Sequence, residues 1–270
     1  MGDVNSLSYK IINDESIIRF TKSSIYNDII EFITNLNKSV VGVEMKPLED
    51  FKLCNENDMI NNDNFLFLSK NVYNIFQLIK NMNKCIDSCP PINQSSRFGN
   101  RGFQHFCDAY YKEVDEYLPH ALSESNIPNI SEHTYQISYY LKNSIGNKKR
   151  IDYGTGHELN FLLFLFCLNK INFFIPSDYK HLVLVLYRQY IEKKELLELW
   201  APKYLYFDAL KYISMIKHAP FHESSQMLYD ISGVETWEKI CNGLLKMYQA
   251  EIIQKRQILQ HILFGNLIDF

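Results

Sequence analysis

The chain has 270 residues, of which 46% are hydrophobic and 22% are charged. This length predicts one large domain or two small ones, and the composition is that of a globular chain, which excludes a disordered or fibrous protein. The formal net charge of −3 excludes a global field that attracts DNA or RNA, so a basic site must be local.

The six cysteines are scattered along the chain, and no pair has the spacing of a zinc finger. This usage favours a reducing, intracellular setting, and we expect a cytoplasmic protein that is also found in the nucleus. No apolar run approaches the ~20 residues that span a bilayer, so no membrane span is expected.

Helical periodicity dominates the first half of the chain. Apolar residues from Ile25 to Leu36 follow one helical stripe, and residues 68–86 resume the pattern until Pro90-Pro91 stops it. Between them, the polar segment from Asn55 to Asn64 predicts a surface loop. A further helix carries Phe103 and Leu118 on one face.

Pro119 and Pro128 bracket the next predicted break in the chain. Residues 135–145 then form a predicted helix that Gly146-Asn147 closes, which is typical of a helix C-terminus. Four more predicted helices follow: one from Thr155, one from Pro176 to about Trp200, one from Tyr204 to His218, and a long one from Glu235 to about Leu263. About eight helices with little strand signal predict a single all-α domain over residues 1–270.

The segment Arg150–Glu158 combines three signals at the start of one of these helices. Thr155 and Glu158 have the spacing of a capping box. Gly154 and Gly156 permit positive φ and a close approach to the backbone. The apolar run 161–168 follows, so a buried helix is expected to begin here.

Two interpretations of this segment are open. The free amides and partial positive charge of a helix N-terminus suit an anion, and Lys148, Lys149 and Arg150 add full charges just upstream. Alternatively, the segment is a well-capped helix start beside a basic surface turn.

Three separated blocks of the sequence resemble the phosphotyrosyl phosphatase activator family, also described as the serine/threonine protein phosphatase 2A activators. The first block runs from Pro90-Pro91 through Arg97-Phe98-Gly99-Asn100 to Phe103, and the second from Tyr140 to Glu158. The third contains Pro220-Phe221, Trp237, Gly243-Leu244, Met247-Tyr248, Gln260-His261 and Phe264-Gly265. The blocks occur in the order of the family and span most of the chain.

The resemblance implies an all-α protein with a deep cleft between helical subdomains. It implies ATP and magnesium as cofactors, peptidyl-prolyl cis–trans isomerase activity, and a partner that is the catalytic subunit of protein phosphatase 2A, alone or with its scaffold subunit. By position, the implied nucleotide-binding residues are Arg150, Thr155, Gly156, Gln260 and His261. The residues of the implied cleft are Arg97, Phe98, Gly99, Asn100, Asp152, Tyr153 and His157.

The residues themselves leave several roles open. Arg150 is expected to hold phosphate, and its alternative is a salt bridge to Asp152, which would then orient it. Arg97 and Asn100 line the cleft or tie their loop down. Gln260 and His261 are adjacent on a predicted helix, so their side chains should point about 100° apart.

One departure from the family pattern bears on function. Family members carry a segment with Gly-Val-Trp-Gly-Leu-Asp-Asp where this chain has only residues 198–203 between two predicted helices. That segment supplies magnesium-binding and phosphatase-contacting positions in the family. The alternative function is therefore a shortened, non-enzymatic phosphatase-binding or chaperone-like protein.

Overall fold

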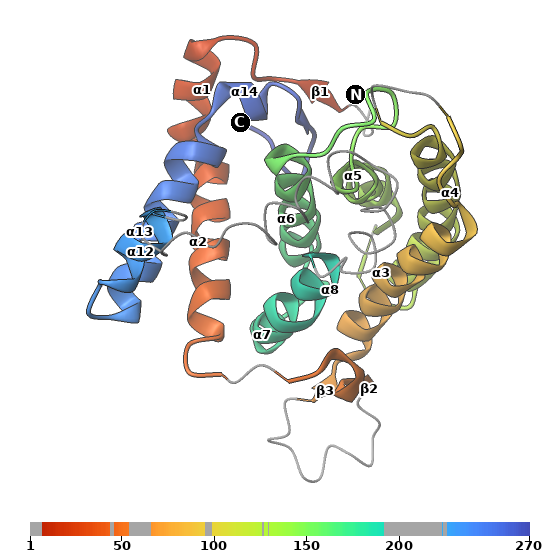
Figure 1. Ribbon diagram of the computed structural model, residues 1–270, viewed down its shortest axis with the longest axis horizontal. Coiled ribbons are helices and arrows are strands. Elements are labelled where there is room, and N and C mark those ends of the chain that lie inside the picture. Colours follow the sequence, from red (N-terminus) through yellow and green to blue (C-terminus); the bar gives the residue numbers. More distant parts are fainter. Residues whose placement is uncertain are drawn as a thin grey trace. The chain divides into compact units, whose positions relative to one another are not determined.

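The computed structural model describes residues 7–43, 46–53, 66–94, 99–125, 127–128, 130–191, 223 and 226–270. Helices dominate these residues, which confirms the predicted all-α class (Figure 1). The chain separates into two compact units, one formed by Met1–Glu192 with Arg256–Phe270 and the other by Lys193–Lys255. A single domain over residues 1–270 and a deep cleft between subdomains stay predictions.

The first two helices begin at side-chain caps that the sequence supplies. Asn13 and Ser16 form a capping box at the start of α1 (Asp14–Thr21), and Ser23 accepts from the amide of Tyr26 at the start of α2 (Ser24–Ser39). The apolar stripe predicted for residues 25–36 is the buried face of α2, which begins immediately after its cap.

Four helices then pack against each other in chain order: α3 (Lys70–Ser88), α4 (Gly102–Ser123), α5 (Ile130–Ser144) and α6 (Thr155–Lys170). The predicted break between Pro119 and Pro128 is confirmed, but it starts later than Pro119, because α4 continues through this proline to Ser123. Proline inside a helix costs about 3 kcal/mol. Leu118, Ala121 and Leu122 on either side are buried, and this burial outweighs the lost backbone hydrogen bond.

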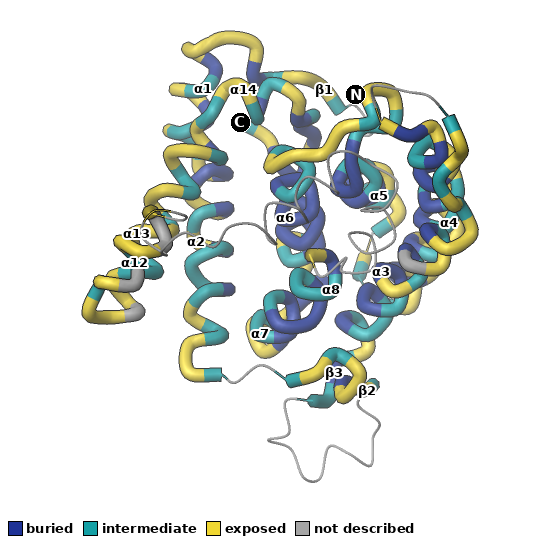
Figure 2. The backbone as a smooth tube through the Cα atoms, viewed as in Figure 1, coloured by how far each residue is buried: buried dark blue, intermediate teal, exposed yellow. Residues whose placement is uncertain are grey.

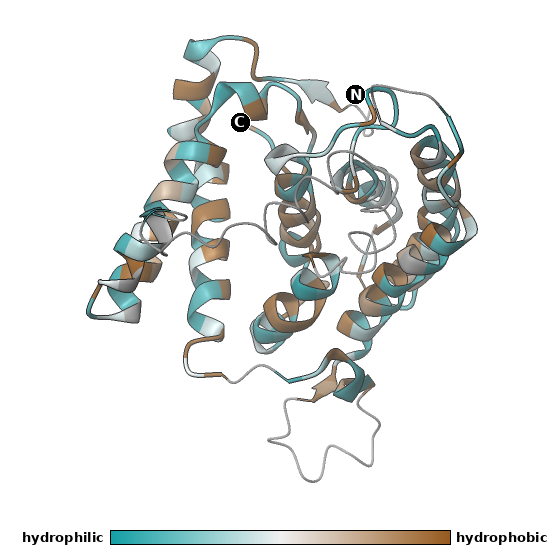
Figure 3. Cartoon of the chain, in the orientation of Figure 1, coloured by the Kyte–Doolittle hydropathy of each residue, from teal (hydrophilic) through white to brown (hydrophobic). Residues whose placement is uncertain are grey.

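Helix α6 is the most buried element of its unit. All ten residues from Leu159 to Leu168 are buried, so the helix is enclosed around its whole circumference and not along one stripe (Figure 2). Figure 3 shows hydrophobic residues along most of its length. The predicted buried helix at residues 161–168 is confirmed, and its polar N-terminal turn is where the helix meets solvent.

The predicted helix at Pro176 is confirmed, but it is built from several turn types. A 3-10 turn, η3 (Pro176–Asp178), leads into α7 (Tyr179–His181), a π-helical stretch, η4 (Leu182–Tyr187), and α8 (Arg188–Ile191). The rest of this predicted helix, the helix at 204–218 and the loop at 55–64 lie outside the described residues.

The predicted long helix from Glu235 to about Leu263 is wrong. In the second unit, α12 (Gln226–Ser232) is followed by α13 (Trp237–Tyr248) and a π-helical turn, η6 (Gln249–Ile253). Helix α14 (Arg256–Leu259) belongs to the first unit. The apolar spacing of Ile252, Leu259 and Ile262 continues across the break, but the chain passes from one unit to the other there and the helix ends.

Two small sheets complete the described structure. Strand β1 (Ser8–Tyr9) pairs antiparallel with β4 (Leu263–Phe264), with Tyr9 opposite Leu263. Strand β2 (Lys52–Leu53), which follows a 3-10 turn, η1 (Leu48–Asp50), pairs in parallel with β3 (Phe67–Leu68). Within the described part of the chain, no helix has the length and hydropathy required to cross a membrane.

Residues near the two ends of the chain meet in an aromatic cluster beside the β1–β4 pair. The ring centroids of Phe20, Phe264 and Phe270 lie 5.0–5.8 Å apart in edge-on arrangements. Arg19 lies over the ring of Phe270, 5.5 Å from its centroid. Phe20 and Phe264 are each 1% exposed, so the C-terminal segment is part of the core of the first unit.

We expect Phe264→Ala to lower the free energy of unfolding by about 3–5 kcal/mol, because it opens a cavity between Phe20 and Phe270. The control is Ile12→Ala in the N-terminal segment of the same unit, since Ile12 is 68% exposed and its truncation should change stability by less than about 0.5 kcal/mol. Urea denaturation followed by circular dichroism measures both. Equal losses for the two variants would show that the aromatic cluster has no special contribution.

Candidate functional site

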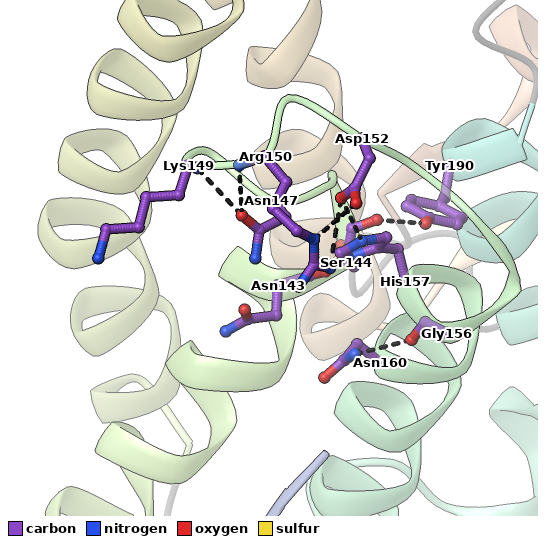
Figure 4. A network of polar contacts seen from close by, with 10 residues as sticks. All are labelled: Asn143, Ser144, Asn147, Lys149, Arg150, Asp152, Gly156, His157, Asn160 and Tyr190. Carbon is purple, nitrogen blue, oxygen red and sulfur yellow. Dashed lines mark hydrogen bonds and ion pairs between the residues drawn. The ribbon is translucent and has the colours of Figure 1, made fainter. Parts of the chain in front are cut away.

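The turn between α5 and α6 is shaped by its own hydrogen bonds (Figure 4). The amide of Asn147 donates to the carbonyl of Asp152 at 2.9 Å, and the amide of Ile151 donates to the carbonyl of Asn147 at 2.7 Å. The side-chain oxygen of Asn147 accepts from the amides of Lys149 and Arg150 at 3.0 and 2.9 Å. This Asx-type turn fixes the backbone that carries Arg150.

The positive φ angles of this region lie at Gly146 (φ 125°) and Ile151 (φ 54°), and not at Gly154 or Gly156 as expected. Gly154 is extended, with φ −171°. The φ of Ile151 lies in the left-handed region, which a β-branched residue rarely adopts. Ile151 is held in it while its side chain lies against Gly99, where an added Cβ would come within 2.3 Å of the Ile151 methyl group. The Gly99 loop and the Asn147 turn are therefore in contact.

Arg150 forms a salt bridge with Asp152, which was the predicted alternative to phosphate binding. Its Nε donates to Asp152 Oδ2 at 2.6 Å and its Nη2 to Oδ1 at 3.4 Å. Asp152 thus orients Arg150, as proposed. Both side chains are about half exposed, 53% and 47%, so the pair contributes little to stability and can exchange partners.

The predicted capping box of Thr155 and Glu158 is wrong. Helix α6 begins at Thr155 itself, Gly154 is its N-cap, and no side chain in the described structure caps it. The amide of His157 bonds to the carbonyl of Gly154 at 2.8 Å. The amides of Thr155 and Gly156 are consequently available to an anion at the positive end of a helix of 16 residues.

His157 connects this first turn to both neighbouring segments. Its Nδ1 lies 2.6 Å from the carbonyl of Asn143 at the end of α5, so the ring donates from Nδ1. Its Nε2 lies 3.8 Å from Asp152 Oδ1, and its ring stacks on Tyr153 at an interplanar angle of 20°. Asp152 is therefore placed between Arg150 and the first turn of α6.

A chain of hydroxyl groups joins α8 to the same turn. Tyr190 donates to the carbonyl of Ser144 at 2.6 Å, so the 2.9 Å contact between the two hydroxyls is a donation from Tyr153 to Tyr190. Burial raises the pKa of both phenols, so both stay protonated. The Glu158 carboxylate lies 3.4 Å from the Tyr153 hydroxyl, which is a long distance for a hydrogen bond, and it does not cap α6.

Gln260 and His261 do not lie on a helix. They follow α14 in a turn, and their side chains point toward each other, with Gln260 Nε2 3.3 Å from His261 Nε2. The segment reaches the start of α6 through Ile258, whose methyl group would lie 3.5 Å from a Cβ added to Gly156. The structure thus brings the C-terminal segment beside the Thr155–Gly156 turn.

The remaining residues of the predicted cleft divide into two groups. Asn100 ties its loop down, because its side chain accepts from the amides of Ile92 and Gly102 and donates to the carbonyl of Ile92. Gly99 is in contact with Ile151, as described above. Arg97 and Phe98 lie outside the described residues.

Several residues of this site were not predicted from the sequence. Asn147 shapes the turn, the carbonyls of Asn143 and Ser144 hold His157 and Tyr190, and Asn160 donates to the carbonyl of Gly156 at 2.7 Å. The Gly146-Asn147 pair was the one available signal, and it indicated only a helix stop. Asn160 is 4% exposed, and its buried Oδ1 has no partner in the described structure.

The donor set at this turn fits phosphate oxygens: two uncapped amides at a helix N-terminus and one exchangeable guanidinium. It does not fit a metal ion in the same way. Asp152 is paired with Arg150, and the described residues contain no group of three histidine, cysteine, aspartate or glutamate side chains that could hold a metal. No magnesium ligand is therefore assigned.

Comparison with known proteins identifies a family. The model of the phosphotyrosyl phosphate activator (PTPA) protein family matches residues 7–193 and 191–270. A probable serine/threonine-protein phosphatase 2A activator 1 of Dictyostelium discoideum is 28% identical, over 96% of this chain and 89% of that protein. A serine/threonine-protein phosphatase 2A activator 2 of Candida glabrata is 31% identical, over 97% and 82%. The crystal structure of the PP2A phosphatase activator Ypa1 has the same fold, with a TM-score of 0.68 and 22% identity over 97% of this chain and 93% of that one.

We expect Tyr190→Phe to destabilise the chain by about 1–3 kcal/mol, because the carbonyl of Ser144 loses its donor in a buried position. Tyr153→Phe removes the hydroxyl that donates to Tyr190. Tyr153 is 50% exposed, so the loss of this hydrogen bond should cost less than about 1.5 kcal/mol. Thermal unfolding of both variants separates them. A larger loss for Tyr153→Phe would contradict the conclusion that the buried Tyr190–Ser144 hydrogen bond contributes more to stability.

Proposed function

The chain belongs to the phosphotyrosyl phosphate activator (PTPA) family, and from this membership we propose that it activates protein phosphatase 2A by binding its catalytic subunit. The names of the Dictyostelium and Candida relatives support this function, since both are phosphatase 2A activators aligned over almost all of this chain. Binding of the catalytic subunit alone, or together with its scaffold subunit, is part of the proposal.

The proposed activation depends on ATP, and one observation carries this part. The amides of Thr155 and Gly156 are uncapped at the N-terminus of α6, while Arg150 is held beside that turn through Asp152 and His157. A helix N-terminus with a nearby guanidinium is a binding site for phosphate groups. Gln260 and His261 are the proposed contacts from the C-terminal segment.

Asp152 holds the Arg150 guanidinium, so phosphate must take the place of this carboxylate before Arg150 can bind it. In the structure the guanidinium is paired with the carboxylate, which keeps its donors oriented. A triphosphate carries more charge than one carboxylate and presents more acceptor oxygens, so the exposed pair can give way to it at little cost. The proposed role of Asp152 is therefore to hold Arg150 in place until phosphate takes over its donors.

Peptidyl-prolyl isomerase activity is proposed on family grounds alone. Rotation about an amide has an uncatalysed barrier of about 18–20 kcal/mol and requires no nucleophile or base, so no catalytic residue is assigned. The second candidate function is a shortened, non-enzymatic phosphatase-binding or chaperone-like protein. It is favoured by the departure from the family sequence at residues 198–203, which lie outside the described structure.

Adding the chain with ATP and magnesium to inactive phosphatase catalytic subunit should restore serine/threonine phosphatase activity above the level with ATP and magnesium alone. The same preparation is assayed with a proline-containing peptide for isomerisation. Co-sedimentation with the catalytic subunit, without gain in either assay, would favour the non-enzymatic binder. Absence of both binding and activation, with the chain folded, would refute the proposed function.

Arg150→Ala should weaken ATP binding by roughly 10- to 150-fold, since a charge-assisted hydrogen bond contributes about 1.5–3 kcal/mol. The matched control is Lys149→Ala, which removes the same charge from the neighbouring exposed position. Calorimetric titration with ATP measures both affinities, and equal weakening would indicate general attraction instead of a direct contact.

The variant Asp152→Asn tests the carboxylate side of the Arg150–Asp152 ion pair. If the carboxylate competes with phosphate for Arg150, its neutralisation should leave ATP affinity unchanged or raise it by up to about 10-fold. Loss of affinity in Asp152→Asn as large as that in Arg150→Ala would contradict competition and assign Asp152 an orienting role that the bound state still needs.

A further inference from the structure

A pocket lies in the first unit, and none of the residues that line it belongs to the site around the Thr155–Gly156 turn. It has a volume of about 390 Å³ and is bounded by η1, β2, one face of α3 and Gln189 of α8. From α3 it receives Tyr73, Phe76, Gln77 and Lys80. Their spacing of three, four and seven residues places them on one face of the helix.

The floor of this pocket is aromatic. Phe51, directly before β2, is 5% exposed, and Phe76 of α3 is 6% exposed, so both rings are fixed in the core while contributing surface to the pocket. Phe51 is held by edge-on packing against His181, at a centroid distance of 6.4 Å. Leu48 and Leu53 add half-buried apolar surface. Such a floor suits a planar or branched apolar group.

Four polar side chains that line this pocket have no partner among the residues that the structure describes. Lys52, Lys80, Gln77 and Gln189 make no hydrogen bond or ion pair with their side chains in the described structure. Several lysines elsewhere in the same unit have carboxylate partners, such as Lys10 with Asp269, Lys70 with Glu124, Lys142 with Asp115 and Lys148 with Asp108, whereas others, such as Lys84, have none in the described structure. The pocket therefore presents unused donors above an apolar floor.

The charges of the lining favour a ligand with one negative charge. The lining contains two ammonium groups, Lys52 and Lys80, and one carboxylate, Glu49, which leaves a single excess positive charge. The two glutamine amides supply further donors and acceptors for a carboxylate or for a polar group next to it. Lysine is a flexible point charge, so it imposes less geometry on its partner than arginine would.

We propose that this pocket binds a small organic monoanion, a carboxylate attached to an aromatic or branched apolar body. The apolar body lies on Phe51 and Phe76, and the carboxylate is held by Lys52 and Lys80. The volume is within the range of small-molecule sites, which is about 300–1,000 Å³. The site is independent of the proposed function, since it shares no residue with the Arg150 turn.

The test uses naphthylacetate as the probe and its neutral amide, naphthylacetamide, as the matched ligand. Each is titrated into the full chain with isotope-labelled leucine methyl groups, and the signals of Leu48 and Leu53 are followed. We expect saturable millimolar binding of the acid, as for a fragment-sized ligand, and binding of the amide that is weaker by about 3-fold or more.

The variant Lys52→Gln with Lys80→Gln should weaken binding of the acid by roughly 3- to 20-fold and leave binding of the amide unchanged. The control is Lys84→Gln, one turn further along α3, exposed and outside the pocket. Three results would overturn the proposal: no saturable shift at Leu48 and Leu53, equal affinity for acid and amide, or a loss in Lys84→Gln as large as that in the pocket variant.

Discussion

Helix α6 is enclosed by protein around its full circumference, and this imposes the arrangement of the first unit. A helix with ten consecutive buried residues has no solvent-facing stripe, so other elements must cover every side of it. Helix α5 covers one side, and α14 contacts it from the C-terminal end of the chain. Its backbone hydrogen bonds are satisfied internally along its length, but the first-turn amides have no intrahelical acceptors. The free amides of α6 are therefore at its N-terminus, and this is where the candidate site lies.

Around that N-terminus, groups that might have neutralised it are engaged elsewhere. Glu158 has the spacing to cap the helix, yet no side chain caps α6 in the described structure and the Glu158 carboxylate lies 3.4 Å from the Tyr153 hydroxyl, while Asp152 is paired with Arg150. The turn is held rigid by bonds that do not use the free amides: the Asn147 side chain, the Asn143 carbonyl on His157, and the Tyr153–Tyr190–Ser144 hydroxyl chain. A site whose donors are fixed before binding loses less conformational entropy when an anion arrives.

In the first unit, some lysines form ion pairs that connect helices, and others have charges that are available to a ligand. Lys142 and Lys148 pair with carboxylates of α4 and so connect α4 to α5 and to the turn that follows it. Lys52 and Lys80 have no such role, and they border an aromatic floor. The helix N-terminus and the lysine-lined pocket differ accordingly in chemistry: rigid amide and guanidinium donors suit phosphate, whereas flexible ammonium groups over an apolar floor suit a carboxylate with an apolar body.

The sequence by itself determined the class of fold and indicated the segment that carries the candidate site. Helical periodicity along residues 25–36 and the uninterrupted apolar run of α6 are local properties, and each reappears in the structure. Only the tertiary structure decided the features that depend on contacts distant in sequence. Pro119 stays helical because burial on both sides outweighs its cost, and the last predicted helix ends where the chain passes between units. Glycine spacing suggested positive φ at Gly154 and Gly156, but the left-handed residue is Ile151, since its packing on Gly99 fixes it. Whether Thr155 or Gly154 caps α6, and whether Arg150 meets a carboxylate, followed from backbone geometry that no local pattern encodes.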